Sequence, residues 1–171
     1  SVCLAELGHT VTGIAENETL IANFQKNIPP LLEPRLAELL EANQKNGRLT
    51  YTTDFGAIRN TNVVWFAFDT PVDDEDEVDL APVWAALEKA MPHLQNGVTI
   101  AASSQLPAGT SKQLIEKIRS ARPELAFEYF YSPENLRLGA AVQCFMEPGR
   151  EVVGADTSLS LENAKNIFAP L

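Results

Sequence analysis

The sequence predicts an α/β fold with a doubly wound, mostly parallel sheet and helices on both faces, in three α/β/α layers. Short apolar segments alternate with amphipathic segments along the chain, which is the order of a β-α-β protein. The run Val63–Phe68 is apolar at every position, as expected of a strand that is buried on both faces. Polar loops follow several of these runs, so the strands are expected to end at a common edge.

The first part of the chain is predicted to contain three helices and two strands. Gly8 stands where a helix would end in a left-handed cap, and the pair Pro29-Pro30 separates two later helical segments. We expect helices at Ser1–Leu7, Glu18–Asn27 and Glu33–Asn43, and strands at His9–Ile14 and Leu49–Thr52.

The second part repeats the alternation with longer helices. In the segment Leu80–Leu94 the apolar residues Val83, Leu87, Ala90 and Leu94 recur at helical spacing. We expect strands at Val63–Phe68, Val98–Ala102, Ala126–Tyr131 and Val152–Gly154, and helices at Leu80–Leu94, Ser111–Ala121 and Leu159–Phe168.

Composition limits the classes of partner. The chain has 171 residues, enough for one domain with a real core, and a formal net charge of −10. That charge disfavours nucleic acid and anionic membranes, but helix N-termini can still bind phosphate groups. Cys3 and Cys144 are too few for a disulfide framework, so we expect reduced, buried thiols in a cytoplasmic protein. No apolar stretch is long enough to span a bilayer, and no signal peptide is visible.

The acidic run Asp73–Glu77 raises the question of a metal site, because hard cations bind clustered carboxylates. Five consecutive acids cannot all converge on one ion. A solvated loop that places negative charge near a helix N-terminus explains the run better, so no metal is expected.

Three polar loops carry the functional signal. Each follows a predicted strand: Asp69-Thr70-Pro71, then Ser104–Thr110, then Ser132–Gly139. In an open parallel sheet, ligands bind outside the carboxyl ends of the strands. We therefore expect these loops to form one rim of a binding crevice.

The three loops resemble signature loops of the UDP-glucose/GDP-mannose dehydrogenase family, the nucleotide-sugar dehydrogenases. Further segments match in order and spacing, so the resemblance covers nearly the whole chain; these are Ala5–Ile14, Ile28–Pro30, Glu33–Leu36 and Phe145–Gly154. The resemblance implies a single Rossmann-like, NAD-binding domain over residues 1–171, without the family's central and C-terminal domains.

The resemblance begins partway into the family's NAD-binding domain. A Rossmann unit opens with a strand and a Gly-x-Gly-x-x-Gly turn that binds the pyrophosphate, and both would precede Ser1. The sequence also lacks an initiator Met, so we expect an N-terminally incomplete fragment. Either the natural polypeptide supplies the missing strand, or the sheet is rearranged with the His9–Ile14 and Val63–Phe68 strands paired directly.

The resemblance assigns candidate catalytic residues to two loops. Glu134 matches the family glutamate that works with a bound water, and a carboxylate in a closed cleft is a plausible general base. Capping of nearby N–H groups is the alternative role for Glu134. Gln105 stands where the family has a threonine beside the reaction centre, and its amide can hydrogen-bond ligand or water.

Candidate cofactor contacts come from three further residues. Thr70 matches a threonine that touches the cofactor, although a turn or capping hydroxyl is an equal alternative. Ser104 offers a hydroxyl. The family's ribose-binding acid falls at Ala15, and the neighbouring Glu16 substitutes for it only if the turn is shifted by one residue.

The family oxidises the primary alcohol of a sugar nucleotide to the uronic acid with two NAD+, through a cysteine in a later domain. The resemblance therefore implies NAD as cofactor, a UDP-sugar as substrate, a homodimer for the full-length protein, and no activity of this chain alone. The alternative is a non-catalytic binding or scaffold domain that kept the fold and lost NAD affinity. A Ser-His-Asp hydrolase is a poor third, because His9 and His93 are not in such a context and no Gly-x-Ser-x-Gly motif is present.

Overall fold

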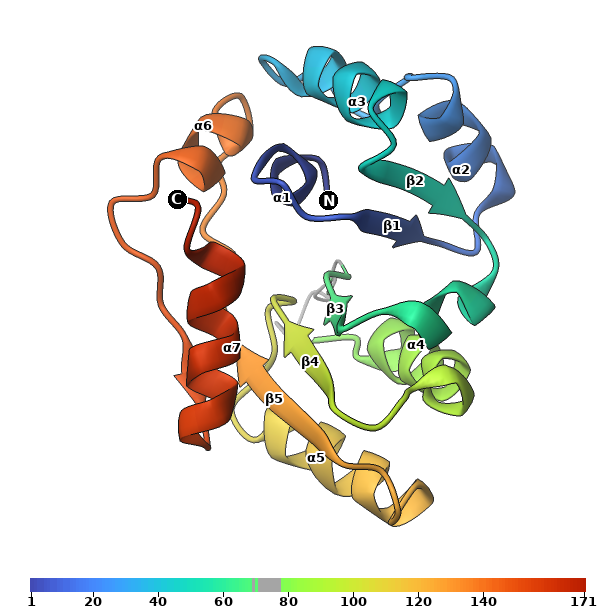
Figure 1. Cartoon of the computed structure of the whole chain (residues 1–171), viewed down its shortest axis with the longest axis vertical. Coiled ribbons are helices and arrows are strands. Elements are labelled where there is room, and N and C mark those ends of the chain that lie inside the picture. The colour runs from blue at the N-terminus through green and yellow to red at the C-terminus, as the bar shows by residue number, and fades with distance from the viewer. Residues whose placement is uncertain (69, 71–77) are drawn as a thin grey trace. The chain divides into compact units, whose positions relative to one another are not determined.

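The computed structural model describes residues 1–68, 70 and 78–171 (Figure 1). The chain divides into two compact units, which are described separately below. The first unit contains Ser1–Phe55, Asn135–Arg150 and Phe168–Leu171, and the second contains Gly56–Glu134 and Glu151–Ile167.

The first unit is built on two parallel strands, β1 (Val11–Ile14) and β2 (Leu49–Thr52), with Val11 opposite Leu49. Four helices belong to this unit, namely α1 (Val2–Glu6), α2 (Glu18–Gln25), α3 (Leu36–Lys45) and α6 (Ala141–Met146). Helices α2 and α3 contact β2, while α1 contacts α3 and α6.

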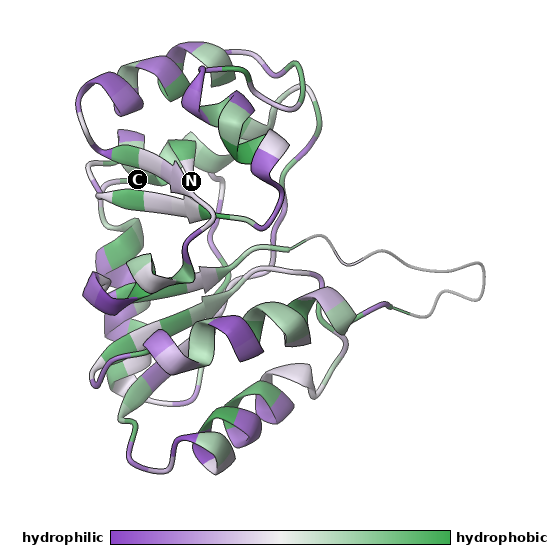
Figure 2. Cartoon of the chain, turned by 90° about the vertical axis from the view of Figure 1, so that its right-hand side faces the viewer, coloured by the Kyte–Doolittle hydropathy of each residue, from purple (hydrophilic) through white to green (hydrophobic). Residues whose placement is uncertain are grey.

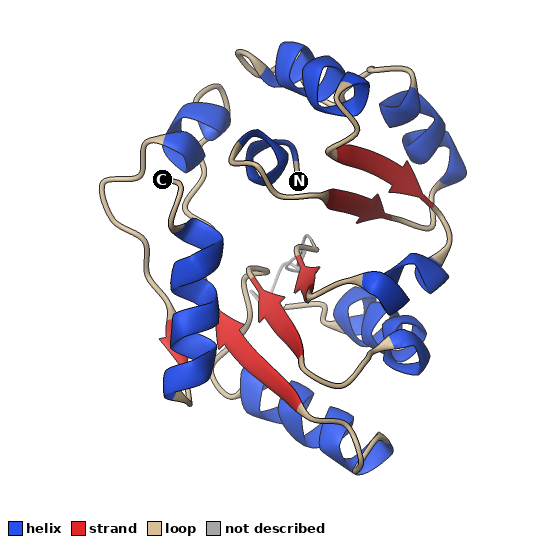
Figure 3. Cartoon of the chain, viewed as in Figure 1, coloured by secondary structure: helices blue, strands red, loops and turns tan. Residues whose placement is uncertain are grey.

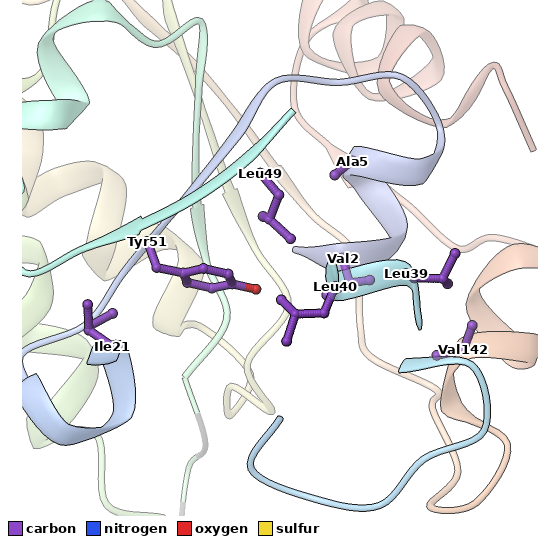
Figure 4. Close-up of a cluster of buried hydrophobic side chains, with 8 residues drawn as sticks. All are labelled: Val2, Ala5, Ile21, Leu39, Leu40, Leu49, Tyr51 and Val142. Carbon is purple, nitrogen blue, oxygen red and sulfur yellow. The ribbon is translucent and has the colours of Figure 1, made fainter. Parts of the chain in front are cut away.

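A cluster of buried apolar side chains forms the core of the first unit. Figure 4 shows Leu40, Leu49 and Tyr51 extending toward one another from α3 and β2; the remaining members are Val2, Ala5, Ile21, Leu39 and Val142. The ring of Tyr51 stacks on Phe24, with ring centroids 4.4 Å apart. Burial of these side chains gives the small sheet its stability, at roughly 1.5–3 kcal/mol for each fully buried large residue.

The second unit contains a four-stranded sheet in the order β3-β4-β5-β6 (Figure 3). Strands β3 (Val63–Phe66), β4 (Val98–Ala102) and β5 (Phe127–Tyr131) are parallel, and the short β6 (Gly154–Ala155) is antiparallel to β5. Every residue of β4 is buried, as expected of a central strand. The helical elements here are η1 (Phe55–Asn60), α4 (Ala81–Ala90), η2 (Met91–His93), α5 (Thr110–Ala121) and α7 (Ser158–Phe168).

Helices α5 and α7 cover opposite faces of this sheet. Thr99 and Ile100 are neighbours on β4, paired with Glu128 and Tyr129 of β5, and neighbouring strand residues point to opposite faces. On one face Asn163 of α7 donates a hydrogen bond to the Thr99 hydroxyl, at 2.9 Å. On the other face the hydroxyls of Tyr129 and Ser111 of α5 lie 2.9 Å apart. The second unit is therefore a three-layered α/β/α arrangement.

The helices are amphipathic, as their sequences predict. Figure 2 shows hydrophilic and hydrophobic residues alternating along them. In α5 the side chains of Leu114, Ile115 and Ile118 are buried, while Lys112 and Glu116 are exposed. This spacing of three to four residues places one apolar stripe against the sheet.

The fold class is confirmed, and several predicted boundaries are corrected. The strand predicted at Val63–Phe68 ends at Phe66, and the strand predicted at Val152–Gly154 covers Gly154–Ala155 instead. The helix predicted at Leu80–Leu94 breaks after Ala90 and continues as a 3-10 turn, because Pro92 lacks an N–H group and clashes with the preceding turn. Helix α6 was not predicted.

The proposed rearrangement of the sheet is not found. Strand β1 pairs with β2 and strand β3 pairs with β4, and within the described part of the chain no ladder joins β1 to β3. Asp69, Pro71 and the acidic run Asp73–Glu77 lie outside the described residues. None of the described helices has both the length and the apolar character needed to cross a bilayer.

Candidate functional site

The carboxyl ends of β3, β4 and β5 carry the loops that the sequence singled out, and all three loops belong to the second unit up to Glu134. Two hollows of about 580 and 360 Å³ lie at these loops, and Gln105 and Glu134 line both. The sequence therefore predicted correctly that the second and third loops come together. The two candidate catalytic side chains lie on the boundary between the hollows.

The two hollows differ in chemical character. Mostly apolar side chains complete the wall of the larger one; they are Val78, Leu106, Pro107, Tyr131 and Pro133. Hydroxyl groups contribute to the smaller one, which is completed by Ala67, Phe68, Thr70, Ser103 and Ser104. The larger hollow suits a flat ring of low polarity, and the smaller hollow suits a ligand rich in oxygen atoms.

Glu134 and Gln105 are both exposed in the second unit. The closed cleft expected around Glu134 is therefore not provided by the residues of this unit alone. An exposed carboxylate can still accept a proton from a water molecule within hydrogen-bond reach. Enclosure of Glu134 requires a further surface, such as a bound ligand.

Ser104 is buried, and its hydroxyl has a structural partner. The backbone N–H of Phe68 donates to Ser104 Oγ at 2.9 Å, which joins the loop after β3 to the loop after β4. A hydroxyl that accepts one hydrogen bond retains its own hydrogen for donation. Ser104 can therefore hold the loops together and also donate to an acceptor in the smaller hollow.

Thr70 forms a second connection between the same two loops. Its hydroxyl donates to the backbone carbonyl of Gln105 at 3.2 Å. The donor of Thr70 is thus engaged within the protein, and only the oxygen lone pairs are left for a ligand. This contact supports the role of a turn hydroxyl for Thr70, which is the alternative to a contact with the cofactor.

The start of α5 offers less to an anion than its sequence suggests. Gly109 precedes the helix in the left-handed conformation, with φ of 92°. The N–H of Thr110 donates to the carbonyl of Pro107 at 3.1 Å, and Thr110 is buried. This N–H is therefore not available to a phosphate group.

Two residues that support the site were missed by sequence reasoning. Tyr131, the last residue of β5, donates from its phenol to the carbonyl of Ser104 at 3.1 Å. Ser132 is buried, receives backbone support through its N–H bond to Ala102, and bonds to Glu151 through its hydroxyl. A phenol at the end of a strand that precedes a polar loop was the only sequence signal for Tyr131.

Glu16 belongs to the first unit, whereas the other candidate residues belong to the second. It is exposed and directly follows β1, where Ala15 still pairs with β2 through a hydrogen bond from its N–H to Thr52. Asn17 then caps α2 by accepting a hydrogen bond from the N–H of Leu20 at 2.9 Å. Glu16 therefore lies at the carboxyl edge of the β1–β2 sheet, one residue after Ala15, which is the position at which the resemblance places the ribose-binding acid.

Neither cysteine lines the hollows. Cys3 is half-buried in α1 and Cys144 is half-buried in α6, and both thiols are free. Burial raises the pKa of the Cys3 thiol, which disfavours the reactive thiolate. Among the residues that the structure describes, no cluster of three His, Cys, Asp or Glu side chains could hold a metal ion.

The fold and the loops define the class of protein. A parallel α/β sheet with polar loops at the carboxyl ends of its strands is the architecture of Rossmann-type dinucleotide-binding domains. The sequence matches the NAD-binding domain of the UDP-glucose/GDP-mannose dehydrogenase family over residues 1–171, and the chain belongs to this family. NAD is the cofactor of such domains.

Curated relatives agree with the family assignment. The chain is 35% identical to the UDP-glucose 6-dehydrogenase of Rhizobium meliloti (strain 1021), with 99% of the chain and 40% of that protein covered. It is 34% identical to UDP-glucose 6-dehydrogenase TuaD of Bacillus subtilis (strain 168), with 98% and 37% covered. The chain thus spans about 40% of the length of these relatives.

Solved structures share the fold. A ternary complex of GDP-mannose dehydrogenase from Pseudomonas aeruginosa superimposes with a TM-score of 0.93 at 25% identity, over 99% of this chain and 41% of that one. A UDP-glucose dehydrogenase from Pyrobaculum islandicum gives 0.91 at 26% identity, over 98% and 40%.

Proposed function

We propose that this chain is the NAD-binding domain of a nucleotide-sugar 6-dehydrogenase, which oxidises the primary alcohol of a UDP-glucose-like substrate to the uronic acid. The observation that supports this proposal most is the joint presence of Gln105 and Glu134 on the walls of two adjoining hollows. In this proposal the domain works within a longer polypeptide, because the dehydrogenases that it resembles are more than twice its length.

The two hollows fit different parts of the ligands. The apolar wall of the larger hollow suits the nicotinamide ring of NAD, while Ser104 and Thr70 in the smaller hollow suit ribose or phosphate oxygens. Glu16, on the edge of the β1–β2 sheet, is assigned to the adenosine ribose. When bound, NAD+ supplies the hydride acceptor.

The residues of this chain supply proton transfer and orientation. Oxidation of an alcohol releases a proton with each hydride, and Glu134 is assigned as the base that accepts this proton through a water molecule. The Gln105 amide can donate to one oxygen and accept from another, so it is assigned to orient that water or the sugar hydroxyl. The cysteine that the second oxidation needs is assigned to another domain, since neither Cys3 nor Cys144 lines the hollows.

The same proposal includes the surroundings of the protein. A UDP-sugar is the assigned substrate, and the full-length protein is assigned as a homodimer. The two free cysteines fit a reducing compartment, so the cytoplasm is the assigned location. The net charge of −10 supports neither nucleic acid nor an anionic membrane as a partner.

A second candidate function is a non-catalytic domain that has kept the fold and lost NAD affinity. The internal bonds of Thr70 and of the Thr110 N–H favour it, because both groups are engaged within the protein. Ala15, which stands at the position of the expected ribose-binding acid, also favours the non-catalytic candidate. The two candidates differ in a single measurable property, which is the affinity for NAD+.

Thermal unfolding of the full-length protein with NAD+, NADP+ or UDP-glucose tests the proposal. NAD+ at about 100 times its dissociation constant is expected to add about 2.7 kcal/mol to the free energy of unfolding. Glu134→Gln should keep this shift and lose NADH formation with UDP-glucose. No shift with NAD+ for the wild-type protein would favour the non-catalytic candidate.

A further inference from the structure

Side chains continue the connection between β3, β4 and β5 beyond the last backbone pairs. At the carboxyl ends of the strands, backbone hydrogen bonds from the N–H of Ser103 to the carbonyl of Phe66 and from the N–H of Ser132 to the carbonyl of Ala102 continue the pairing of the sheet by one step. Further along, Ser104 receives two contacts: its Oγ accepts from the Phe68 N–H at 2.9 Å, and its carbonyl accepts from the Tyr131 phenol at 3.1 Å. Ser104 thus connects the loop after β3 to the loop after β4, and the loop after β4 to the end of β5.

The bond from Tyr131 acts on the backbone that carries Gln105. The carbonyl of Ser104 and the N–H of Gln105 belong to the same peptide group, which is planar and rigid. A phenol that fixes this carbonyl therefore fixes the rotation of the whole group. The Thr70 hydroxyl holds the next carbonyl, that of Gln105 itself, at 3.2 Å. Gln105 is consequently restrained on both sides of its Cα atom.

Tyr131 also connects this restraint to the loop of Glu134. Its ring lines the larger hollow together with Gln105 and Glu134. The next residue, Ser132, is buried and is held by its bond to Glu151. Glu134 therefore follows a fixed strand end, and the phenol spans the space from that strand end to the loop of Gln105.

From this geometry we propose that Tyr131 is a positioning residue, which holds Gln105 in place, through the Ser104 carbonyl, at the hollows that Gln105 shares with Glu134. The inference rests on the proposed dehydrogenase function. Tyr131 acts through Ser104 and Gln105, so its hydroxyl affects the rate of oxidation more than the binding of NAD+. The contact between Tyr131 and Ser104 does not involve Glu16, the residue assigned to the adenosine ribose.

The substitution Tyr131→Phe tests this role, because it removes the phenol and keeps the ring in the wall of the larger hollow. Tyr129→Phe is a matched control on the same strand, since the Tyr129 hydroxyl contacts Ser111 of α5, which lines neither hollow. Both variants lose one hydrogen bond and one oxygen atom. The full-length protein is assayed for NADH formation with UDP-glucose, for the Kd of NAD+ and for thermal unfolding.

For Tyr131→Phe we expect kcat to fall on the order of tenfold, because small displacements of a positioned group lower rates steeply. The Kd of NAD+ for Tyr131→Phe should stay within about twofold of the wild-type value. Tyr129→Phe should keep kcat within about twofold of the wild-type value, although its melting temperature should fall by about as much as that of Tyr131→Phe, because each variant loses one hydrogen bond. Three results would each overturn the positioning role. They are an unchanged kcat for Tyr131→Phe, an equal fall of kcat in Tyr131→Phe and Tyr129→Phe, and a Tyr131→Phe variant that binds NAD+ more weakly but keeps a normal kcat. A wild-type protein that neither binds nor reduces NAD+ refutes the proposed function itself, and the role of Tyr131 with it.

Discussion

Gly13 shows how a single residue of β1 is dictated by its neighbour across the sheet. A Cβ atom built on Gly13 would lie 2.5 Å from two ring atoms of Tyr51, a separation that atoms in contact do not reach. The Tyr51 ring is itself fixed by stacking on Phe24 and by burial in the core of the first unit. Glycine is therefore required at this position for space.

The substitution Gly13→Ala is accordingly expected to lower the free energy of unfolding by about 1–3 kcal/mol, the usual range for overpacking. Urea unfolding monitored by circular dichroism measures the loss. Gly149→Ala is the matched control, since a Cβ there meets nothing within 4 Å, and we expect a change within about 0.5 kcal/mol. Equal stabilities of the two variants would contradict the tight contact with Tyr51.

For individual residues, the sequence could predict which candidate site residues lie close together, but not the hydrogen bonds that hold them in place. Gln105 and Glu134 follow parallel strands of one sheet, so their meeting follows from topology alone. The Tyr131 contact with Ser104 depends on how far each loop extends, which spacing does not encode. The exposure of Glu134 likewise depends on surfaces distant in sequence.

Helix α7 illustrates how a whole element is stabilised at its start. The Thr157 hydroxyl accepts a hydrogen bond from the Ser160 N–H at 2.9 Å, and the Ser160 hydroxyl accepts from the Thr157 N–H at 3.2 Å. This reciprocal capping satisfies N–H groups that have no partner inside the helix. The Thr157 hydroxyl also bonds to Glu128 of β5, which ties the helix start to the sheet.

Thr157→Ala should therefore destabilise the protein by about 1–2 kcal/mol, the upper range for the loss of an N-cap residue. Thermal unfolding followed by circular dichroism measures this effect. Thr157→Ser keeps the oxygen and should recover most of the stability, while Ser158→Ala, at an exposed position, should change little. If Thr157→Ser proved as unstable as Thr157→Ala, packing of the methyl group would be the cause, and not capping.

The elements most visible in the sequence are those with the strongest apolar pattern. Val98–Ala102 and Leu49–Thr52 coincide with their predicted bounds: the first is a mostly apolar segment that is buried throughout, and the second alternates apolar and polar residues, as in a half-buried strand. Helix α6 was missed because Ala141–Met146 is too short to show a helical period. The end of α4 at Ala90 could have been predicted from Pro92. The helical spacing of apolar residues, which continues to Leu94, led instead to a longer predicted helix.

The electrostatics of the whole chain bear on the choice of cofactor. A net charge of −10 repels anions, and the exposed Glu16 lies after β1, where a ribose hydroxyl is expected. NADP+ differs from NAD+ by a phosphate on that ribose. A carboxylate accepts a hydrogen bond from the ribose hydroxyl, but it has no donor for a phosphate and repels its charge.

We therefore expect the full-length protein to bind NADP+ at least about tenfold more weakly than NAD+, a difference of about 1.4 kcal/mol. Part of this discrimination should disappear at high ionic strength, because the Debye length falls from about 30 Å at 0.01 M salt to about 3 Å at 1 M. Titration calorimetry with both cofactors at low and high salt measures this discrimination, and Glu16→Gln should reduce it. A preference that is insensitive to both salt and Glu16→Gln would mean that shape, and not charge, excludes the phosphate, and Glu16 would then have no part in choosing the cofactor.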